Sequence, residues 1–151
     1  MEIASYITGF VDGEGCFHVS FSFRKERHDK LEIRPSFSIS QNQRSTEVLN
    51  VIQRYFQCGY IRRSVRDSTL KYEVRSLTDL ERIIIPHFEK YQLQTSKQAD
   101  FVHFAEIVKI LRANRSIDRT KESLIIEKAY LMNKSGTRRY DKAHFLRQLT
   151  R

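Results

Sequence analysis

Strict alternation of apolar and polar residues over two consecutive stretches constrains the fold of this chain more than any other feature. The stretches are residues 17–24 and 32–40, and their apolar positions are in phase. A period of two residues is the pattern of a β-strand with one face in the core and one in water. The charged segment between them, residues 25–30, predicts a turn, so the two stretches should form a β-hairpin. Pro35 cannot donate to a strand ladder, which indicates an edge position or a bulge.

A second, shorter alternating pair follows at residues 61–66 and 70–75, with Ile61 and Val65 on its apolar side. This pair predicts a second hairpin that turns near residues 66–69. Elsewhere, apolar residues recur at spacings of three and four, which is the pattern of helices with one buried face. Helices are therefore expected from residue 3 to the glycines at positions 13 and 15, and over residues 45–56, 78–91, 96–113 and 121–133.

The expected order is α-β-β-α-β-β-α-α-α, an α+β fold whose four-stranded antiparallel sheet carries helices over one face. Thr78 and Glu81 fit a capping box at the start of the third helix, and Pro86 should kink or split that helix. A length of 151 residues suits a single domain over residues 1–151. The tail, residues 135–151, is basic and only weakly amphipathic.

The charge balance points to a polyanionic partner. The chain has 27 Lys and Arg residues against 18 Asp and Glu residues, giving a net charge of +9, and nucleic acid is the simplest partner to neutralise it. Solubility alone is the competing explanation. Cys16 and Cys58 are not spaced as a zinc site or a disulfide framework. No stretch approaches the roughly 18 apolar residues of a membrane span, and the N-terminus lacks the basic start of a signal peptide.

The polar face of the sheet carries side chains that can read DNA. Because helices should cover only the apolar face, the other face remains open, and Arg, Lys, Ser and Glu side chains on a β-ribbon can reach base edges and phosphates in a major groove. A solvated face without a partner is the alternative. The predicted contacts, together with His18 on the same face, are Ser20, Ser22, Arg24, Glu32, Arg34, Ser36, Ser38, Arg62, Ser64, Arg66, Lys71, Glu73 and Arg75.

The segment ITGFVDGEG, residues 7–15, places two acids among three glycines where the first helix ends. The carbonyl end of a helix is partially negative, so Glu14 is locally unfavourable there and a compensating cation is expected. Gly9 and Gly13 lie four residues apart on one helix face, where a second backbone could approach closely. For the glycines alone, an incidental helix stop is the commoner explanation.

This segment, with the alternating hairpin behind it, resembles the signature of the LAGLIDADG homing endonucleases. The order of elements is similar to that of the single-motif members over nearly the whole chain, and SISQNQ and KYQLQTSKQADF also resemble family segments. The resemblance implies that the concave face of the sheet binds double-stranded DNA. It also implies a homodimer that pairs through the first helix, with an interface at Ile7, Gly9, Phe10, Asp12 and Gly13.

The resemblance implies a metal-dependent active centre at the end of the first helix. Glu14, with the backbone carbonyl of Gly13, would bind Mg²⁺ or Mn²⁺ through oxygen ligands, as hard cations prefer. Asp12 would have a structural role at the helix junction. The bound ions would promote hydrolysis of the phosphodiester bond.

Two further catalytic residues follow from the resemblance. Gln41 matches a polar position that orients the attacking water in family members, although a simple strand-end residue is an equal alternative. Lys97 matches the basic residue that offsets charge on the scissile phosphate, although Thr95 or Ser96 could occupy that position instead. Ser45 stands where a relative would offer a basic group, so electrostatic help from that point is not expected.

One motif per chain implies two chains for a double-strand cut, and therefore a pseudo-palindromic target. Arg34 and Arg62 are candidates for bidentate guanine contacts, whereas Arg138 and Arg139 in the tail should contact phosphates. The alternatives are a maturase with intron RNA as its partner, a non-catalytic DNA-binding regulator, and an unrelated basic RNA-binding module. An organelle or a microbial cytoplasm is the location that the resemblance implies.

Overall fold

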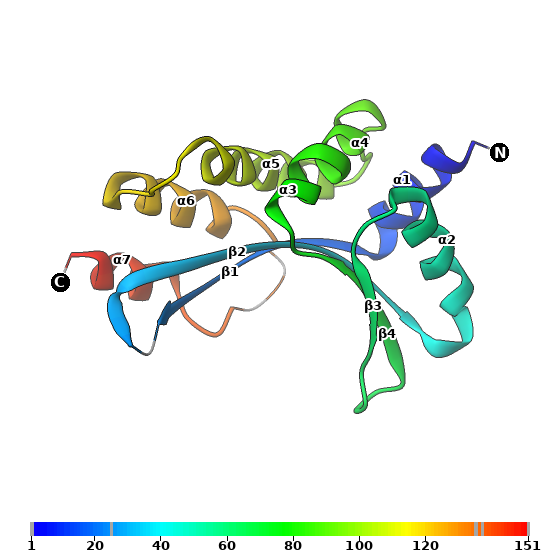
Figure 1. Ribbon diagram of the computed structural model, residues 1–151, viewed down its shortest axis with the longest axis horizontal. Helices are drawn as coiled ribbons and strands as arrows, with labels where there is room; N and C mark the ends of the chain where they lie inside the picture. Colours follow the sequence, from blue (N-terminus) through cyan, green and yellow to red (C-terminus); the bar gives the residue numbers. More distant parts are fainter. Residues whose placement is uncertain (1, 25, 135, 137, 151) are drawn as a thin grey trace.

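The computed structural model describes residues 2–24, 26–134, 136 and 138–150. Four strands form one antiparallel sheet in the order β1-β2-β4-β3, and the helices gather on one side of it, leaving a curved, concave face on the other (Figure 1). This confirms the predicted α+β fold. The elements are α1 (Ile3–Glu14), β1 (Gly15–Arg24), β2 (Arg27–Asn42), the 3₁₀ turn η1 (Gln43–Ser45), α2 (Thr46–Phe56), β3 (Tyr60–Arg63), β4 (Thr69–Val74), α3 (Leu77–Asp79), the π turn η2 (Leu80–Ile84), α4 (Ile85–Lys90), α5 (Lys97–Ala113), α6 (Arg119–Tyr130) and α7 (Lys142–Leu149).

The core lies between the apolar face of the sheet and the helical layer. Phe17 of β1 and Phe37 of β2 are fully buried, and their rings stack at a centroid distance of 5.3 Å. Phe88 meets the Phe17 ring edge-on at 5.4 Å, and Phe104 packs on it at 5.2 Å. Truncating a Phe in such a core typically costs about 3–5 kcal/mol, so these rings hold the helices to the sheet.

The first hairpin turns more tightly than the sequence predicted. β2 begins at Arg27, and Arg24 pairs with Arg27 after a register shift at Phe23. The expected turn at residues 25–30 is therefore too long, because charged residues in a strand give no apolar alternation. Pro35 lies opposite Val19, before the first β2–β4 pair at Phe37, and so it sits where β2 has a described neighbour on one side only.

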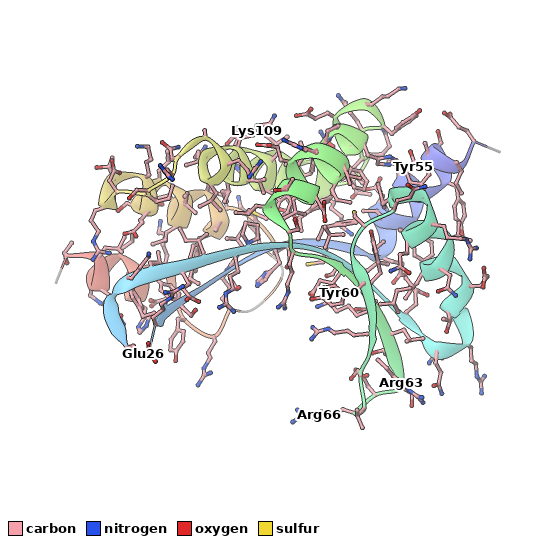
Figure 2. All side chains as sticks on the ribbon, in the orientation of Figure 1. Glu26, Tyr55, Tyr60, Arg63, Arg66 and Lys109 are labelled. Carbon is pink, nitrogen blue, oxygen red and sulfur yellow. The ribbon has the colours of Figure 1, made fainter. Side chains whose placement is uncertain are left out.

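The second hairpin also differs from its prediction. β3 ends at Arg63, and residues 64–68 form the turn, so Ser64 and Arg66 lie beyond the strand. Val65 is 98% exposed at this turn, and placing it on the apolar side was wrong. Figure 2 shows Arg63 and Arg66 toward the far end of this hairpin, which extends away from the helices.

The helix after β4 begins at a different cap from the predicted one. Ser76 accepts a hydrogen bond from the backbone N–H of Asp79 at 3.3 Å, so the helix starts before Thr78. The π turn η2 precedes α4, which has Pro86 in its first turn. Proline is tolerated there because the first N–H groups of a helix have no intrahelical partner. The helix was predicted to kink or split at Pro86, but the backbone stays helical on both sides of the π turn, so Pro86 does not split it.

The tail contains a helix that the sequence reading missed. In α7, Phe145 and Leu149 are buried and form a small cluster with Leu31 and Ile126. Their spacing of four residues places them on one face, so calling the tail only weakly amphipathic was wrong. Among the helices of the described ranges, none is both long and apolar enough to span a bilayer.

Candidate functional site

Glu14 and Gln41 meet at the end of α1. The Glu14 side chain is exposed, and the Gln41 Nε2 amide donates to its Oε2 oxygen at 3.3 Å. Gln41 lies in the β2 pairing with β4, opposite Leu70. The structure thus brings together two of the three predicted catalytic residues, from elements 27 positions apart in sequence.

Lys97, the third predicted catalytic residue, lies at the same helix end. Its ammonium donates to the Val11 carbonyl at 2.9 Å, and the Gly15 N–H also donates to this carbonyl. The last carbonyls of a helix lack intrahelical partners and carry partial negative charge. Lys97 therefore places a positive charge against the carbonyl end of α1.

Asp12 anchors α1 to the loop before α5. Its carboxylate accepts hydrogen bonds from the Gln94 N–H at 2.7 Å and from the Thr95 N–H at 3.1 Å, as well as from the Thr95 hydroxyl. Burial raises the pKa of Asp12, but these hydrogen bonds and the nearby Lys97 charge outweigh it and leave the pKa below its ordinary value. Thr95 thus has a structural role in this contact, beside the position predicted for Lys97.

The donor groups at this end of α1 fit a divalent cation. Glu14 offers an exposed carboxylate, and Gly13, also exposed, has one of the last carbonyls of the helix; oxygen ligands of this kind suit Mg²⁺. No group of three or more His, Cys, Asp or Glu residues in the described part of the chain could hold a metal ion.

The outward face of α1 has open space beside its glycines. A Cβ added at Gly9 or Gly13 would meet nothing within 4 Å, so packing within this chain does not require glycine at either position. Phe10 is partly exposed on this helix. Ile7, by contrast, is fully buried in the core of its own chain, so its predicted place in a dimer interface is corrected.

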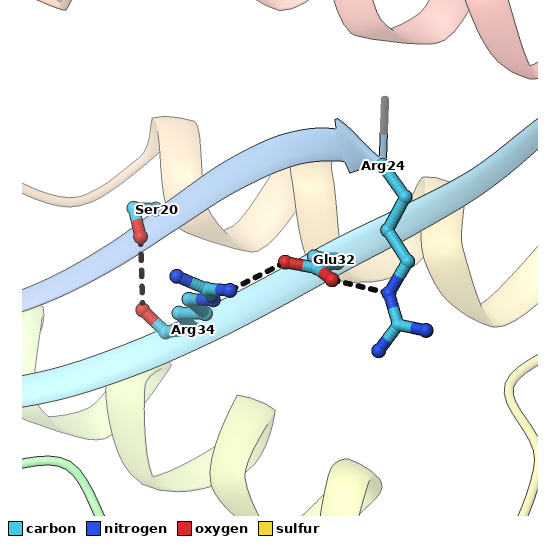
Figure 3. A network of polar contacts seen from close by, with 4 residues as sticks. All are labelled: Ser20, Arg24, Glu32 and Arg34. Atoms are coloured by element: carbon cyan, nitrogen blue, oxygen red, sulfur yellow. Dashed lines mark hydrogen bonds and ion pairs between the residues drawn. The ribbon is translucent and has the colours of Figure 1, made fainter. Parts of the chain in front are cut away.

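The polar face of the first hairpin carries a connected group of charged residues (Figure 3). Glu32 accepts from Arg24 and from the Arg34 guanidinium at 2.6 Å. The hydrogen bond from Arg24 is the largest cause that holds the pKa of Glu32 below its ordinary value, and Arg34 adds to it. Ser20 donates to the Arg34 carbonyl at 3.4 Å. Ser22 lies opposite Glu32, and Ser36 lies opposite His18.

The predicted contacts on the second hairpin fall into two groups. Arg62 pairs with Lys71 across β3 and β4, and Arg62 is exposed while Lys71 is half-buried. Glu73 is only 1% exposed, so the prediction that it contacts DNA directly is corrected: its carboxylate is enclosed by neighbouring side chains. Ser38 belongs to β2 of the first hairpin and lies opposite Glu73; at 6% exposure it is likewise too enclosed for a direct contact.

Arg138 and Arg139 have different surroundings. The Arg138 guanidinium donates to the Val19 carbonyl at 2.9 Å and to the Ala129 carbonyl at 3.1 Å. It therefore covers the free edge of β1, which gives Arg138 a structural role in addition to the predicted phosphate contact. Arg139 is exposed, with its guanidinium 5.4 Å from the centre of the Tyr140 ring.

Sequence reasoning missed two residues on the polar face. Ser40 lies opposite Lys71 and continues the period-two series of Ser36 and Ser38, so the alternation itself could have found it. Tyr60 donates its hydroxyl to Glu73 at 2.8 Å. No local signal marks Tyr60, because its role depends on the pairing of β3 with β4.

Comparison with known proteins identifies the family. The sequence profile described as "LAGLIDADG endonuclease" matches residues 7–108, more than half of the chain. The chain therefore belongs to this family. It is similar to the Neurospora crassa protein named "Probable intron-encoded endonuclease 2", with 39% identity over 123 residues that cover 80% of this chain and 27% of that relative. The chain thus spans about a quarter of that relative.

Two solved structures match over nearly their whole length. The homing endonuclease I-TnaI has a TM-score of 0.83 and 28% identity, covering 99% of this chain and 98% of that chain. An archaeal intron-encoded homing endonuclease, I-Vdi141I, complexed with DNA, has a TM-score of 0.86 and 29% identity, covering 97% and 94%. The described fold is thus the fold of homing endonuclease chains of about this length.

Proposed function

We propose that this protein is a site-specific homing endonuclease that makes a double-strand break in a long pseudo-palindromic DNA target by metal-dependent phosphodiester hydrolysis. One observation carries the proposal: the exposed Glu14 carboxylate, held by Gln41, ends a helix whose glycines have open space beside them. The DNA in the solved complex of the related I-Vdi141I supports DNA as the substrate.

The acting unit is a homodimer. Gly9 and Gly13 allow the α1 helix of a second copy to approach closely, and a two-fold axis between the helices brings two Glu14 carboxylates together. β1 has 10 residues, and at about 3.3 Å per residue it spans roughly ten base pairs. Two such ribbons read a target of roughly 20 base pairs with matching halves.

Glu14 and the Gly13 carbonyl would hold Mg²⁺ or Mn²⁺, together with oxygens of the second chain and of DNA. Bound there, the ions would lower the pKa of water and stabilise the leaving oxygen. Gln41 keeps the Glu14 carboxylate oriented through its amide and offers its remaining hydrogen-bonding groups to the attacking water. Lys97 places positive charge beside the scissile phosphate, and Asp12 fixes the helix end from which these groups act.

The test compares the wild-type protein with Glu14→Gln on a library of duplexes about 20 base pairs long. Binding and cleavage are scored separately, with Mg²⁺, with Mn²⁺ and with a chelator. Glu106→Gln is the matched control, because Glu106 is an exposed acid on α5 paired with Lys128, in the helical layer. We expect wild type and control to cut both strands only with metal, and Glu14→Gln to bind the same sequences without cutting.

Three results would contradict the proposal. Cleavage by Glu14→Gln at the wild-type rate would show that the Glu14 carboxylate is not needed to bind the metal. Binding without cleavage by the wild type, with either metal, would point to a DNA-binding regulator. A preference for intron RNA over every duplex would point to a maturase.

A further inference from the structure

Glu73 is a buried carboxylate surrounded by cations on the polar face of the sheet. Its oxygen atoms lie 2.9 Å from Arg75 Nε, 3.4 Å from Lys71 Nζ and 3.7 Å from an Arg62 guanidinium nitrogen. The Tyr60 hydroxyl donates to it at 2.8 Å. The side chain of Glu73 is 1% exposed, whereas those of Arg62 and Arg75 are about half exposed.

The arrangement follows from strand register. Lys71 and Glu73 alternate along β4 and share its polar face, and Arg75 directly follows the end of the strand. Arg62 lies opposite Lys71 and Tyr60 lies opposite Glu73 on β3. The carboxylate is thus central to side chains from both strands. Figure 2 shows Tyr60 on β3, closer to the helical layer than Arg66 at the end of the hairpin.

The carboxylate is ionised despite its burial. Burial raises the pKa of Glu73, but the hydrogen bond from Tyr60 and the charges of Lys71 and Arg75 outweigh it, so the pKa lies below its ordinary value. A buried charge is retained only where it is paired and hydrogen-bonded. Glu73 is therefore a fixed anion, and it restrains flexible Arg and Lys side chains that otherwise sample many rotamers.

We propose that Glu73 is a positioning residue for DNA sequence recognition. It fixes Arg62, Lys71 and Arg75 in one arrangement. These cations then donate hydrogen bonds to particular base edges instead of binding whichever phosphate lies nearby. This inference rests on the proposed function. It replaces a direct contact by Glu73 with an action through three other side chains.

The position of the cluster predicts which base pairs it affects. Glu73 lies opposite Ser38, which lies opposite Cys16, two residues after Glu14. Glu32, which accepts from Arg24 and Arg34, lies opposite Ser22. Ser22 is six positions beyond Cys16 on β1, which is a separation of about 20 Å along the strand at 3.3 Å per residue. Glu73 and Glu32 should therefore affect recognition of two separate groups of base pairs in the half-site.

The experiment measures relative binding and cleavage for every single-base variant of the target selected by the wild type, together with binding to a random duplex. Glu73→Gln keeps the shape of the side chain and removes its charge. Glu47→Gln is the matched control, because Glu47 is an exposed acid 2.9 Å from Arg54 on α2. Tyr60→Phe removes the hydroxyl without a charge change, and Glu32→Gln tests the other cluster. Thermal melts confirm that each variant folds.

For Glu73→Gln we expect discrimination to fall about fivefold or more at the base pairs nearest the active centre, the loss of about one good base contact. Binding to the random duplex should become tighter at low salt, because one negative charge is removed. Glu32→Gln should weaken discrimination between bases at a separate group of base pairs. Glu47→Gln should leave the discrimination profile of the wild type unchanged. Tyr60→Phe should give a smaller loss at the same positions as Glu73→Gln, without tighter binding to the random duplex.

An unchanged discrimination profile in folded Glu73→Gln would overturn the inference, and so would an equal loss in Glu47→Gln. If Glu73→Gln does not fold, a wild-type profile in Tyr60→Phe overturns it. A wild type without any preferred sequence would instead refute the proposed function, and this inference with it.

Discussion

Mild acid should destabilise this protein through one buried histidine, His87, which joins three helices. The Thr8 hydroxyl donates to the Tyr91 carbonyl at 3.2 Å, so it must accept from His87 Nε2, which lies 3.0 Å away. The other ring nitrogen, Nδ1, is then the acceptor for the Tyr55 hydroxyl at 3.1 Å. Protonation at Nδ1 would leave two donors facing each other unless the hydroxyl of Tyr55 turned.

The magnitude follows from the pKa of His87, which burial lowers from 6.5 to about 4. Because the folded pKa is the lower one, the unfolded chain takes up the proton first as the pH falls. The contribution of neutral His87 to the free energy of unfolding is therefore fully present above about pH 6.5. It is lost progressively as the pH falls toward 4. Between pH 7 and pH 5 this linkage should lower the free energy of unfolding by about 2 kcal/mol.

Urea unfolding at pH 7 and pH 5 measures this change. In His87→Gln, the difference between the two pH values should shrink by about 2 kcal/mol relative to wild type. Tyr55→Phe is the control: it should lose about 1 kcal/mol at pH 7 and keep most of the pH dependence, since burial of the imidazole is the cause of its lowered pKa. His18, whose pKa burial and the charges of Arg138 and Lys71 also lower, contributes equally to all three proteins. The same pH dependence in wild type and His87→Gln would refute the reasoning.

Three other substitutions test the accounts of α1 and of the sheet edge. Gly9→Ala should raise the stability of the monomer by up to about 1 kcal/mol through helix propensity, yet lower the dimer fraction in sedimentation; an unchanged dimer fraction would remove Gly9 from the interface. Asp12→Ala should cost about 2–3 kcal/mol of unfolding free energy, because backbone donors lose a charged acceptor; a loss below 1 kcal/mol would contradict its anchoring role. Arg138→Met should cost about 1–3 kcal/mol in urea unfolding, whereas Arg139→Met should stay within about 0.5 kcal/mol of wild type; equal losses would refute the separate roles of the two arginines.

The fold was predictable where burial follows the local period. The alternation of residues 17–24 and 32–40 predicted β1 and most of β2, because every second side chain enters the core. The prediction failed at the hairpin ends, where Val65 sits in a turn and charged residues continue β2. These features depend on pairing geometry, which leaves no hydrophobic signal.

The site was predictable only in part for the same reason. Glu14 and Gln41 could be named from their motif positions, and the structure brings them within hydrogen-bonding distance. The roles of Glu73 and Arg138 could not be predicted, because each depends on strands and loops that are distant in sequence. Alternation places Glu73 on the polar face, but it cannot say that three cations and Tyr60 enclose the carboxylate there.

The most direct test of the central claim, that two chains joined through α1 act on one DNA site, is the mass of the protein on its selected target. The complex should be measured by native mass spectrometry with Glu14→Gln, so that the DNA stays intact, and the wild-type cut should be mapped on both strands. We expect two chains per duplex and one cut in each strand, placed symmetrically about the centre of the target. A single chain per duplex that still cuts both strands would contradict the account.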